Sequence, residues 1–256
     1  MEWLILLLLG ACVGLLAGLF GIGGGLILVP ALSILLPLFS FSDESNALAG
    51  AIAIALATIV ITGLSAAITQ IKQKKVDWFY VRLLAPSLTI GAMIGALLTS
   101  ALPAIWLGLG FGLLEILLAM YMFYGKPPQE TRPHPSAMHS HLFGGFSGSL
   151  SALLGIGGGT LNTPWMVWHS LPLASAIATS SVLGVIIASA GTITHLTNDL
   201  IQWPIVIALV STSLITAPLG AILVHRLPSK PLKRGFSVLL MLLGIMMILK
   251  FGFQIF

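Results

Sequence analysis

Two short glycine-rich strings are the part of this sequence best suited to chemistry. Both read GIGGG, at residues 21–25 and 155–159, and each is followed five residues later by a proline, Pro30 or Pro164. Three consecutive glycines disfavour a helix by about 1 kcal/mol each, so each string should interrupt a helix that restarts behind it. The first turn of a restarted helix has free N–H groups and the positive end of the helix dipole. Such an end binds anions, and glycine lets the anion approach the backbone.

Polar side chains follow the second string, where the first half has only leucine and valine. Three of them come directly after the glycines, and three hydroxyl residues lie two to three turns into the next apolar segment, where they could face the strings. Their alternative role is hydrogen bonding between helices. We predict that a substrate is held by the last three glycines of each string together with these side chains: Gly23, Gly24, Gly25, Gly157, Gly158, Gly159, Thr160, Asn162, Thr163, Thr179, Ser180 and Ser181.

Glu115 is the one acidic residue in the middle of an apolar segment. A charge at that depth of a bilayer costs about 2.5–3.5 kcal/mol on insertion scales. Glu115 is therefore either a proton-coupling carboxylate or a protonated residue bonded to a neighbouring helix, and the residues leave both open. A cation carrier or proton-coupled carrier that uses Glu115 is the alternative function.

An enzymatic alternative rests on Ser147. Residues 145–148 have the form G-x-S-G, and His195 lies on a later helix. The alternative is therefore an intramembrane serine protease with a Ser–His pair. The repeat described below argues against it, because the counterpart of Ser147 is Val13. We predict that the protein is not an enzyme and has no catalytic residue.

No metal site or cofactor is predicted. The three histidines at 134, 139 and 141 do not have the spacing of a zinc site, and the single cysteine, Cys12, excludes Cys-based sites and disulfides. His195 and His225 lie at the ends of apolar segments, where we expect the ring to reach water.

The composition identifies the broad class. Hydrophobic residues make up 57% of the 256 residues, charged residues make up 7%, and mean hydropathy is +1.08. Soluble domains carry about 25% charged residues, so a soluble enzyme is excluded, as is disorder. The net charge of +4 is too small and dispersed for nucleic-acid binding. The chain is expected to be an integral membrane protein whose partner is the lipid bilayer. The amino terminus has no positive n-region or cleavage site, so we expect it to remain in the mature protein.

The chain repeats itself. Residues 14–30 match 148–164, an offset of 134, and from residue 46 the offset becomes 125, so that Trp78 matches Trp203. The predicted units are a first membrane repeat at 1–125, a polar cytoplasmic linker at 126–140 and a second membrane repeat at 141–256. Each repeat has four apolar segments, the first of which contains the glycine string. The expected segments are 3–37, 46–70, 78–101 and 104–124, then 141–169, 172–197, 203–226 and 231–254.

The glycine-broken segments allow two topologies. They either cross the membrane, which gives two repeats of the same orientation, or form re-entrant hairpins, which inverts the second repeat. The positive-inside rule favours the hairpins, because they put ten of the eleven basic residues on one side. That side is then the cytoplasm, and both termini lie outside. Inverted repeats with broken helices are typical of secondary transporters. The basic residues of the cytoplasmic side are Lys72, Lys74, Lys75, Arg82, Lys126, Arg132, Arg226, Lys230, Lys233 and Arg234.

With these motifs the sequence resembles the TauE/SafE sulfite exporter family, also known as the toluene-sulfonate uptake permease group. The resemblance covers essentially the whole chain and implies transport of a small sulfur-containing anion, such as sulfite, sulfoacetate or another organosulfonate, across the cytoplasmic membrane. The small-Thr-Ser stretch of the family is present at residues 178–181, whereas the first half has Ala53-Ile54-Ala55-Leu56. This difference suggests that the second half supplies more of the polar contacts. The resemblance specifies no transport direction and no oligomeric state.

Overall fold

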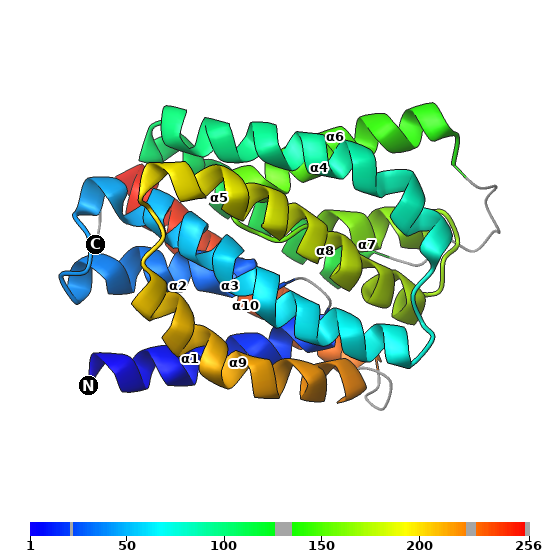
Figure 1. Ribbon diagram of the computed structural model, residues 1–256, viewed down its shortest axis with the longest axis horizontal. Helices are drawn as coiled ribbons and strands as arrows, with labels where there is room; N and C mark the ends of the chain where they lie inside the picture. Colours follow the sequence, from blue (N-terminus) through cyan, green and yellow to red (C-terminus); the bar gives the residue numbers. More distant parts are fainter. Residues whose placement is uncertain (21–22, 126–134, 224–228, 254–256) are drawn as a thin grey trace.

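The computed structural model describes residues 1–20, 23–125, 135–223 and 229–253, and this part of the chain is helical with no strands (Figure 1). The all-α prediction is confirmed. The helices are α1 (Glu2–Phe20), α2 (Gly25–Leu38), α3 (Glu44–Lys72), α4 (Trp78–Ala101), α5 (Ala104–Tyr124), α6 (Ala137–Leu153), α7 (Gly159–Trp168), α8 (Leu173–His195), α9 (Trp203–Leu223) and α10 (Ser229–Phe253), with a 3-10 turn η1 (Leu196–Asn198) before α9.

Seven of the described helices are long and apolar enough to cross a bilayer: α1, α3, α4, α5, α8, α9 and α10. Their length follows from uninterrupted apolar runs bounded by polar or helix-starting residues. Asp77, for example, caps α4, because its carboxylate accepts from the Phe79 N–H at 2.9 Å. Trp78 and Trp203 begin α4 and α9 with the same exposed fraction, 47%, which suits tryptophan at a membrane interface.

Both predicted helix interruptions are confirmed. The chain leaves α1 at Phe20 and resumes as α2 at Gly25, and it leaves α6 at Leu153 and resumes as α7 at Gly159. The restarted helices are short, with 14 residues in α2 and 10 in α7. At 1.5 Å per residue they extend about 21 and 15 Å, less than the roughly 30 Å of a hydrocarbon core.

Helix α6 begins earlier than the sequence predicts. Its first residue is Ala137, inside the region expected to be linker, because Ser136 caps it by accepting from the His139 N–H at 3.4 Å. The other expected segments agree closely with helices, and two of them, 78–101 and 104–124, have the bounds of α4 and α5.

The helices of the two halves pack in matching combinations. Helix α1 packs along α9, and the corresponding α6 packs along α4; α2 packs on α3, and α7 on α8. A third matching combination packs α8 along α4 and α3 along α9, and two counterpart pairs pack on each other, α3 on α8 and α5 on α10. The bundle is therefore built from contacts between the halves as much as within them.

Helices α3 and α8 pack in opposite directions. A Cβ atom on Gly63 would lie 3.2 Å from Val185 Cγ2, whereas one on Gly191 would lie 2.9 Å from Leu56 Cδ1. Later residues of α3 thus meet earlier residues of α8. In Figure 1 the start of α1 and the end of α10 lie at the left end of the bundle, and the connection from α3 to α4 lies at the opposite end.

Helices α5 and α10 are antiparallel in the same way. A Cβ atom on Gly252 would lie 3.3 Å from Leu109 Cδ2, whereas one on Gly244 would lie 2.9 Å from Ile116 Cγ1. Both counterpart pairs, α3–α8 and α5–α10, therefore cross head to tail.

Candidate functional site

Both glycine strings adopt left-handed backbone where a helix restarts. Gly23 and Gly24 have φ of 74° and 84°, and Gly157 and Gly158 have φ of 76° and 77°. Gly24 and Gly158 are the N-cap residues of α2 and α7. Residues with a Cβ rarely adopt this conformation, so the turn requires glycine. Helices α2 and α7 therefore begin at equivalent points of the two strings, and in α7 the N–H of Gly159 donates to the Gly157 carbonyl at 3.0 Å.

The two strings touch each other. A Cβ atom on Gly25 would lie 2.8 Å from Ile156 Cα and would collide with the carbonyl oxygen of Gly155. One on Gly23 would lie 3.6 Å from Gly157 Cα. The structure thus packs the start of α2 against the loop that leads into α7, although the two are far apart in sequence. We refer to residues 23–25 and 155–159 as the two tips.

Helices α3 and α8 enclose the tips at equivalent positions. A Cβ atom on Gly23 would lie 2.9 Å from Ile59 Cγ2, and one on Gly184 would lie 2.5 Å from the Gly157 carbonyl oxygen. Residues 59 and 184 correspond under the offset of 125, so each helix passes the tip of its own half at the same point. Glycine at 184 lets α8 pass against the tip backbone.

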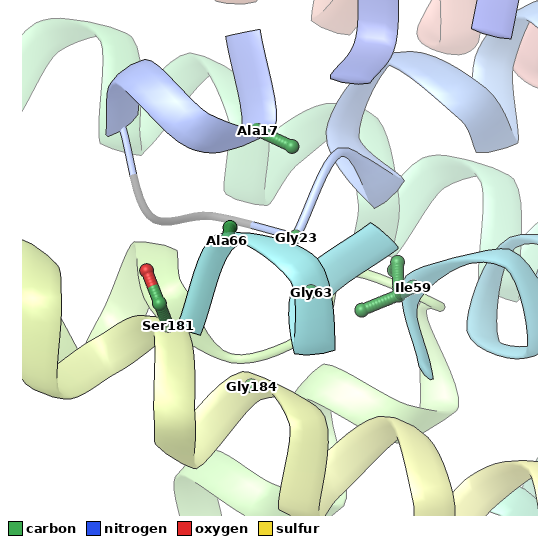
Figure 2. Close-up of a pocket in the computed structure, with 7 residues that line it drawn as sticks. All are labelled: Ala17, Gly23, Ile59, Gly63, Ala66, Ser181 and Gly184. Atoms are coloured by element: carbon green, nitrogen blue, oxygen red, sulfur yellow. The ribbon is translucent and has the colours of Figure 1, made fainter. Parts of the chain in front are cut away.

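A small cavity lies beside the first tip (Figure 2). It is lined by Ala17, Gly23, Ile59, Gly63, Ala66, Ser181 and Gly184. Figure 2 shows the Ser181 side chain rising from α8 on the side where Gly23 and Ala66 lie. The cavity leaves about 10 Å³ for the centre of a water molecule, which is room for about one water. A sulfur oxyanion does not fit there without movement of the surrounding helices.

The polar side chains behind the second tip form hydrogen bonds across three helices. The Ser147 hydroxyl on α6 donates to Asn162 Oδ1 on α7 at 2.8 Å, and the Thr163 hydroxyl donates to Ser180 Oγ on α8 at 2.7 Å. Three buried polar groups in this region have no partner among the described residues: Asn162 Nδ2 and the hydroxyls of Thr160 and Ser151. Unpartnered buried polar groups are rare in proteins, and each one calls for an explanation.

The hydroxyls of residues 179–181 have different surroundings. Thr179 accepts from the Asp77 N–H at 2.9 Å, so it ties α8 to the start of α4. It lies five residues before Gly184, about 7.5 Å along the helix from the point where α8 meets the tip. Ser181 lines the cavity while donating to the Ile177 carbonyl at 3.1 Å. The structure therefore brings Ser180 and Ser181 close to the tips and gives Thr179 a partner elsewhere.

The equivalent residues of the first half are apolar and fully buried. Leu26, Leu28 and Val29 stand where the second half has Thr160, Asn162 and Thr163, and each is 0% exposed. The two tips thus share their backbone conformation and differ in the side chains behind it.

Glu115 lies in the interface between α5 and α10. Its side chain is fully buried, and neither carboxylate oxygen has a hydrogen-bond partner among the described residues. A Cβ atom on Gly244 would lie 3.1 Å from Glu115 Cβ. The part of the chain that the structure describes therefore offers no hydrogen-bond partner on a neighbouring helix for a protonated Glu115 carboxyl group.

The geometry contradicts the Ser–His pair. Ser147 donates to Asn162, and neither ring nitrogen of His195 has a partner among the described residues. The expectation that His195 reaches water is also wrong, because its side chain is 0% exposed. The ring lies inside the bundle at the end of α8, where the 3-10 turn η1 continues the chain. Within the described residues no group of three or more His, Cys, Asp or Glu side chains is arranged to hold a metal ion.

Several predicted residues lie outside the described part of the chain. They are Gly21 and Ile22 of the first string, Lys126, Arg132, His134, His225 and Arg226, and the side chains of Lys230 and Lys233.

Sequence reasoning missed three contributors to this region. Gly155 contacts the opposite tip, Gly184 carries α8 past the second tip, and Ser147 bonds Asn162. The available signal for Ser147 was its spacing of four residues from Ser151, which puts two hydroxyls on one face of α6. No local signal paired either one with α7.

The chain is similar to a known family and to several curated membrane transporters. The sequence model of a family described as "Sulfite exporter TauE/SafE" matches residues 6–247. A "Probable membrane transporter protein" of Haemophilus influenzae is 34% identical over 96% of this chain and 98% of its own length. The "Probable membrane transporter protein YunE" of Bacillus subtilis is 29% identical over 97% of this chain and 98% of its own length. A probable membrane transporter protein of Methanocaldococcus jannaschii is 25% identical over 96% and 95%. No solved structure matches the chain.

Proposed function

The chain belongs to the TauE/SafE sulfite exporter family, and we propose that it moves a small sulfur-containing anion across the cytoplasmic membrane by alternating access. It is a multi-pass membrane transporter rather than an enzyme. The proposed substrate is sulfite, sulfoacetate or another organosulfonate, which the family description suggests. The proposed binding site is the pair of tips with the polar side chains behind the second one.

The meeting of the two tips is the observation that carries this proposal. The start of α2 packs against the loop that leads into α7, and each helix start has left-handed glycines with no side chain to cover the backbone. Helix starts attract negative charge through their N–H groups and dipole. Interrupted helices within a membrane are tolerated where they line a cavity or are buried in protein. A substrate oxyanion between the tips would accept from both.

The head-to-tail crossing of counterparts supports inverted repeats. If both halves crossed the membrane in the same orientation, α3 would run parallel to α8, and α5 to α10. The contacts of Gly63, Gly191, Gly244 and Gly252 give the opposite direction in both pairs. The short α2 and α7 support re-entrant hairpins, because neither is long enough to cross alone. In this arrangement the basic loop between α3 and α4 is cytoplasmic and both termini are outside.

The size of the cavity supports alternating access. A space for about one water beside Gly23 is too small for a sulfur oxyanion. The bound state therefore requires the halves to separate at the tips, and rocking of inverted repeats about a central site provides such a movement.

A cation or proton-coupled carrier remains the second candidate, because Glu115 is buried with both oxygens unpartnered among the described residues. Intramembrane ionisable groups mark ion pathways in many transporters. Glu115 packs against α10 rather than at the tips, so in the proposed mechanism it takes no part in anion binding.

The test is flux of labelled sulfite in proteoliposomes, with sulfoacetate and taurine as competitors, with and without a pH gradient. Saturable flux that the competitors inhibit is the expected result. Flux that follows a cation and ignores the anion would replace the proposal with the cation carrier.

A further inference from the structure

The side-chain amide of Asn162 lies in the first turns of α7, where its oxygen has a hydrogen-bond partner and its NH₂ group has none among the described residues. Its side chain is 0% exposed, its Oδ1 accepts from Ser147, and its Nδ2 has no partner among the described residues. The backbone N–H of Asn162 donates to the carbonyl of Gly158, the N-cap residue, at 3.1 Å. The free NH₂ group lies at the same tip, 3.2 Å from where a Cβ of Gly158 would be.

We propose that Ser147 is a positioning residue that fixes the Asn162 amide with its NH₂ group toward the second tip, where that group donates to an oxygen of the transported oxyanion. This inference rests on the proposed anion transport and deepens it. An amide presents a donor on one side and an acceptor on the other, and its orientation is set by the hydrogen bonds around it. With Oδ1 engaged by the Ser147 hydroxyl, the side toward the tip is the donor.

The orientation determines which charge the tip accepts. The start of α7 carries partial positive charge, and an NH₂ group beside it adds a second donor, so both favour an oxyanion. A flipped amide would turn Oδ1 to the tip, where it would repel the oxyanion and compete for the N–H groups. The hydroxyl of Thr160, buried and without a partner among the described residues, adds another donor in the first turn of the same helix.

This arrangement occurs in the second half alone. The positions equivalent to Ser147 and Asn162 are Val13 and Leu28, and those equivalent to Ser151 and Thr160 are Ala17 and Leu26. The first tip can therefore offer the substrate its backbone but no side-chain donor at these positions. The second tip would supply the specificity for an oxygen-bearing anion.

The experiment compares sulfite KM and maximal rate for wild type, Ser147→Ala, Ser147→Thr and Ser140→Ala in proteoliposomes. Ser140 is the matched control, because it lies two turns earlier on α6, is also 0% exposed and donates only to the Ser136 carbonyl of its own helix. We expect Ser147→Ala to raise KM about tenfold, in keeping with the loss of one oriented donor. Ser147→Thr, which keeps the hydroxyl, and Ser140→Ala should stay within about twofold of wild type.

A role through Asn162 predicts non-additive effects. In an Asn162→Ala background, which itself raises KM, Ser147→Ala should change KM by less than about twofold, because the group that it positions is gone. Asn162→Asp, which keeps the acceptor for Ser147 but replaces NH₂ with a second oxygen, should eliminate sulfite binding. A wild-type KM in folded Ser147→Ala protein, or full additivity with Asn162→Ala, would overturn the inference.

A second measurement separates this inference from the proposed function. Purified wild type and Ser147→Ala are heated with sulfite, sulfoacetate or acetate, and the shift in Tm on anion addition is recorded. Stabilisation of wild type that is reduced in Ser147→Ala supports the positioned amide, even if the wild type moves no sulfur anion and the proposed substrate fails. If no anion raises the Tm of wild type and the KM of Ser147→Ala is unchanged, the Asn162 amide does not donate to the anion. That result would not contradict sulfite transport.

Discussion

Individual glycines leave the backbone at the tips without a covering side chain, and we propose that the substrate binds there. Gly158 has φ of 77°, a backbone conformation that residues with a Cβ rarely adopt, and a Cβ there would collide with the Ile187 side chain. The position therefore disfavours every residue except glycine. A non-glycine residue in left-handed backbone costs about 1–2 kcal/mol. That cost is too small to unfold the bundle, but the added side chain would occupy the point at which α7 begins.

We therefore expect Gly158→Leu to eliminate sulfite flux while the protein still inserts and purifies as a folded species. Gly145→Leu is the matched control on neighbouring α6, because a Cβ there would meet nothing within 4 Å. Flux assays of both variants measure transport, and size-exclusion profiles show whether each variant is folded. Wild-type rates in folded Gly158→Leu protein would contradict a substrate site at the tips.

Replacement of Asn162 by leucine should be as damaging. Asn162→Leu reproduces the residue of the first half, Leu28, in a site that is fully buried. It removes the donor and puts an apolar side chain in its place, so we expect transport to fall to background with normal membrane insertion, whereas the smaller Asn162→Ala should keep measurable flux. Labelled sulfite uptake and the amount of protein in the membrane fraction test this, and retained uptake would assign the site to the backbone alone.

The Glu115 carboxyl group has no partner among the described residues, so a neutral isostere should fit in its place. An unpartnered charge in the bilayer costs about 2.5–3.5 kcal/mol, and glutamine avoids that cost. We expect Glu115→Gln to keep sulfite exchange without a pH gradient within about twofold of wild type. Uptake with and without the gradient is the measurement. Loss of gradient-driven accumulation alone would identify Glu115 as the coupling carboxylate, and loss of exchange itself would contradict its separation from the anion site.

At the scale of elements, the direction in which counterpart helices cross is the decisive feature. Helices α3 and α8 approach closely at two levels, near Gly63 with Val185 and near Leu56 with Gly191. In a parallel pair, Gly63, which follows Leu56 on α3, would lie near a residue of α8 that follows Gly191. It lies instead near Val185, which precedes Gly191. The antiparallel crossing is the feature that supports the proposed inverted repeats.

Cysteine pairs at these two levels should cross-link. In a Cys12→Ser background, Gly63→Cys with Val185→Cys and Leu56→Cys with Gly191→Cys are expected to form disulfides on mild oxidation. Leu56→Cys with Val185→Cys is the control pair, six residues from the observed register and thus about 9 Å too far along the helix. Electrophoretic mobility with and without reductant reports the bond, and efficient cross-linking of the control pair would refute the antiparallel register.

At the scale of the whole molecule, the two ends of the bundle differ in charge. Lys72 ends α3, and Lys74 and Lys75 lie in the connection to α4, which in Figure 1 is at the end of the bundle opposite the start of α1. Basic loops are retained in the cytoplasm. An inverted repeat therefore predicts that Glu2 and Lys75 face opposite sides of the membrane.

Single cysteines at these positions test the topology. In the Cys12→Ser background, we expect Glu2→Cys to react with an impermeant maleimide in intact cells and Lys75→Cys to react only after permeabilisation. Labelling of both from the same side is what two repeats of the same orientation would produce, and it would overturn the inverted arrangement.

Much of this architecture could be predicted because it is encoded locally. The bounds of α4 and α5 follow from apolar runs, and the restarts at Gly25 and Gly159 follow from the low helix propensity of neighbouring glycines. The bond between Asp77 and Thr179 and the burial of His195 could not be read in this way. Both depend on which helix lies alongside, and a hydrogen bond across 102 residues leaves no periodic signal in the sequence.

The sequence alone determined the membrane class, the helical fold and the two helix interruptions, because hydropathy and backbone propensity act within a few turns of chain. Only the tertiary structure decided that Gly25 meets Gly155, that α3 crosses α8 head to tail, and that Ser147 holds Asn162. These contacts join segments whose local preferences are independent of each other. They arise from close packing of the whole bundle, which brings together side chains that are far apart in sequence.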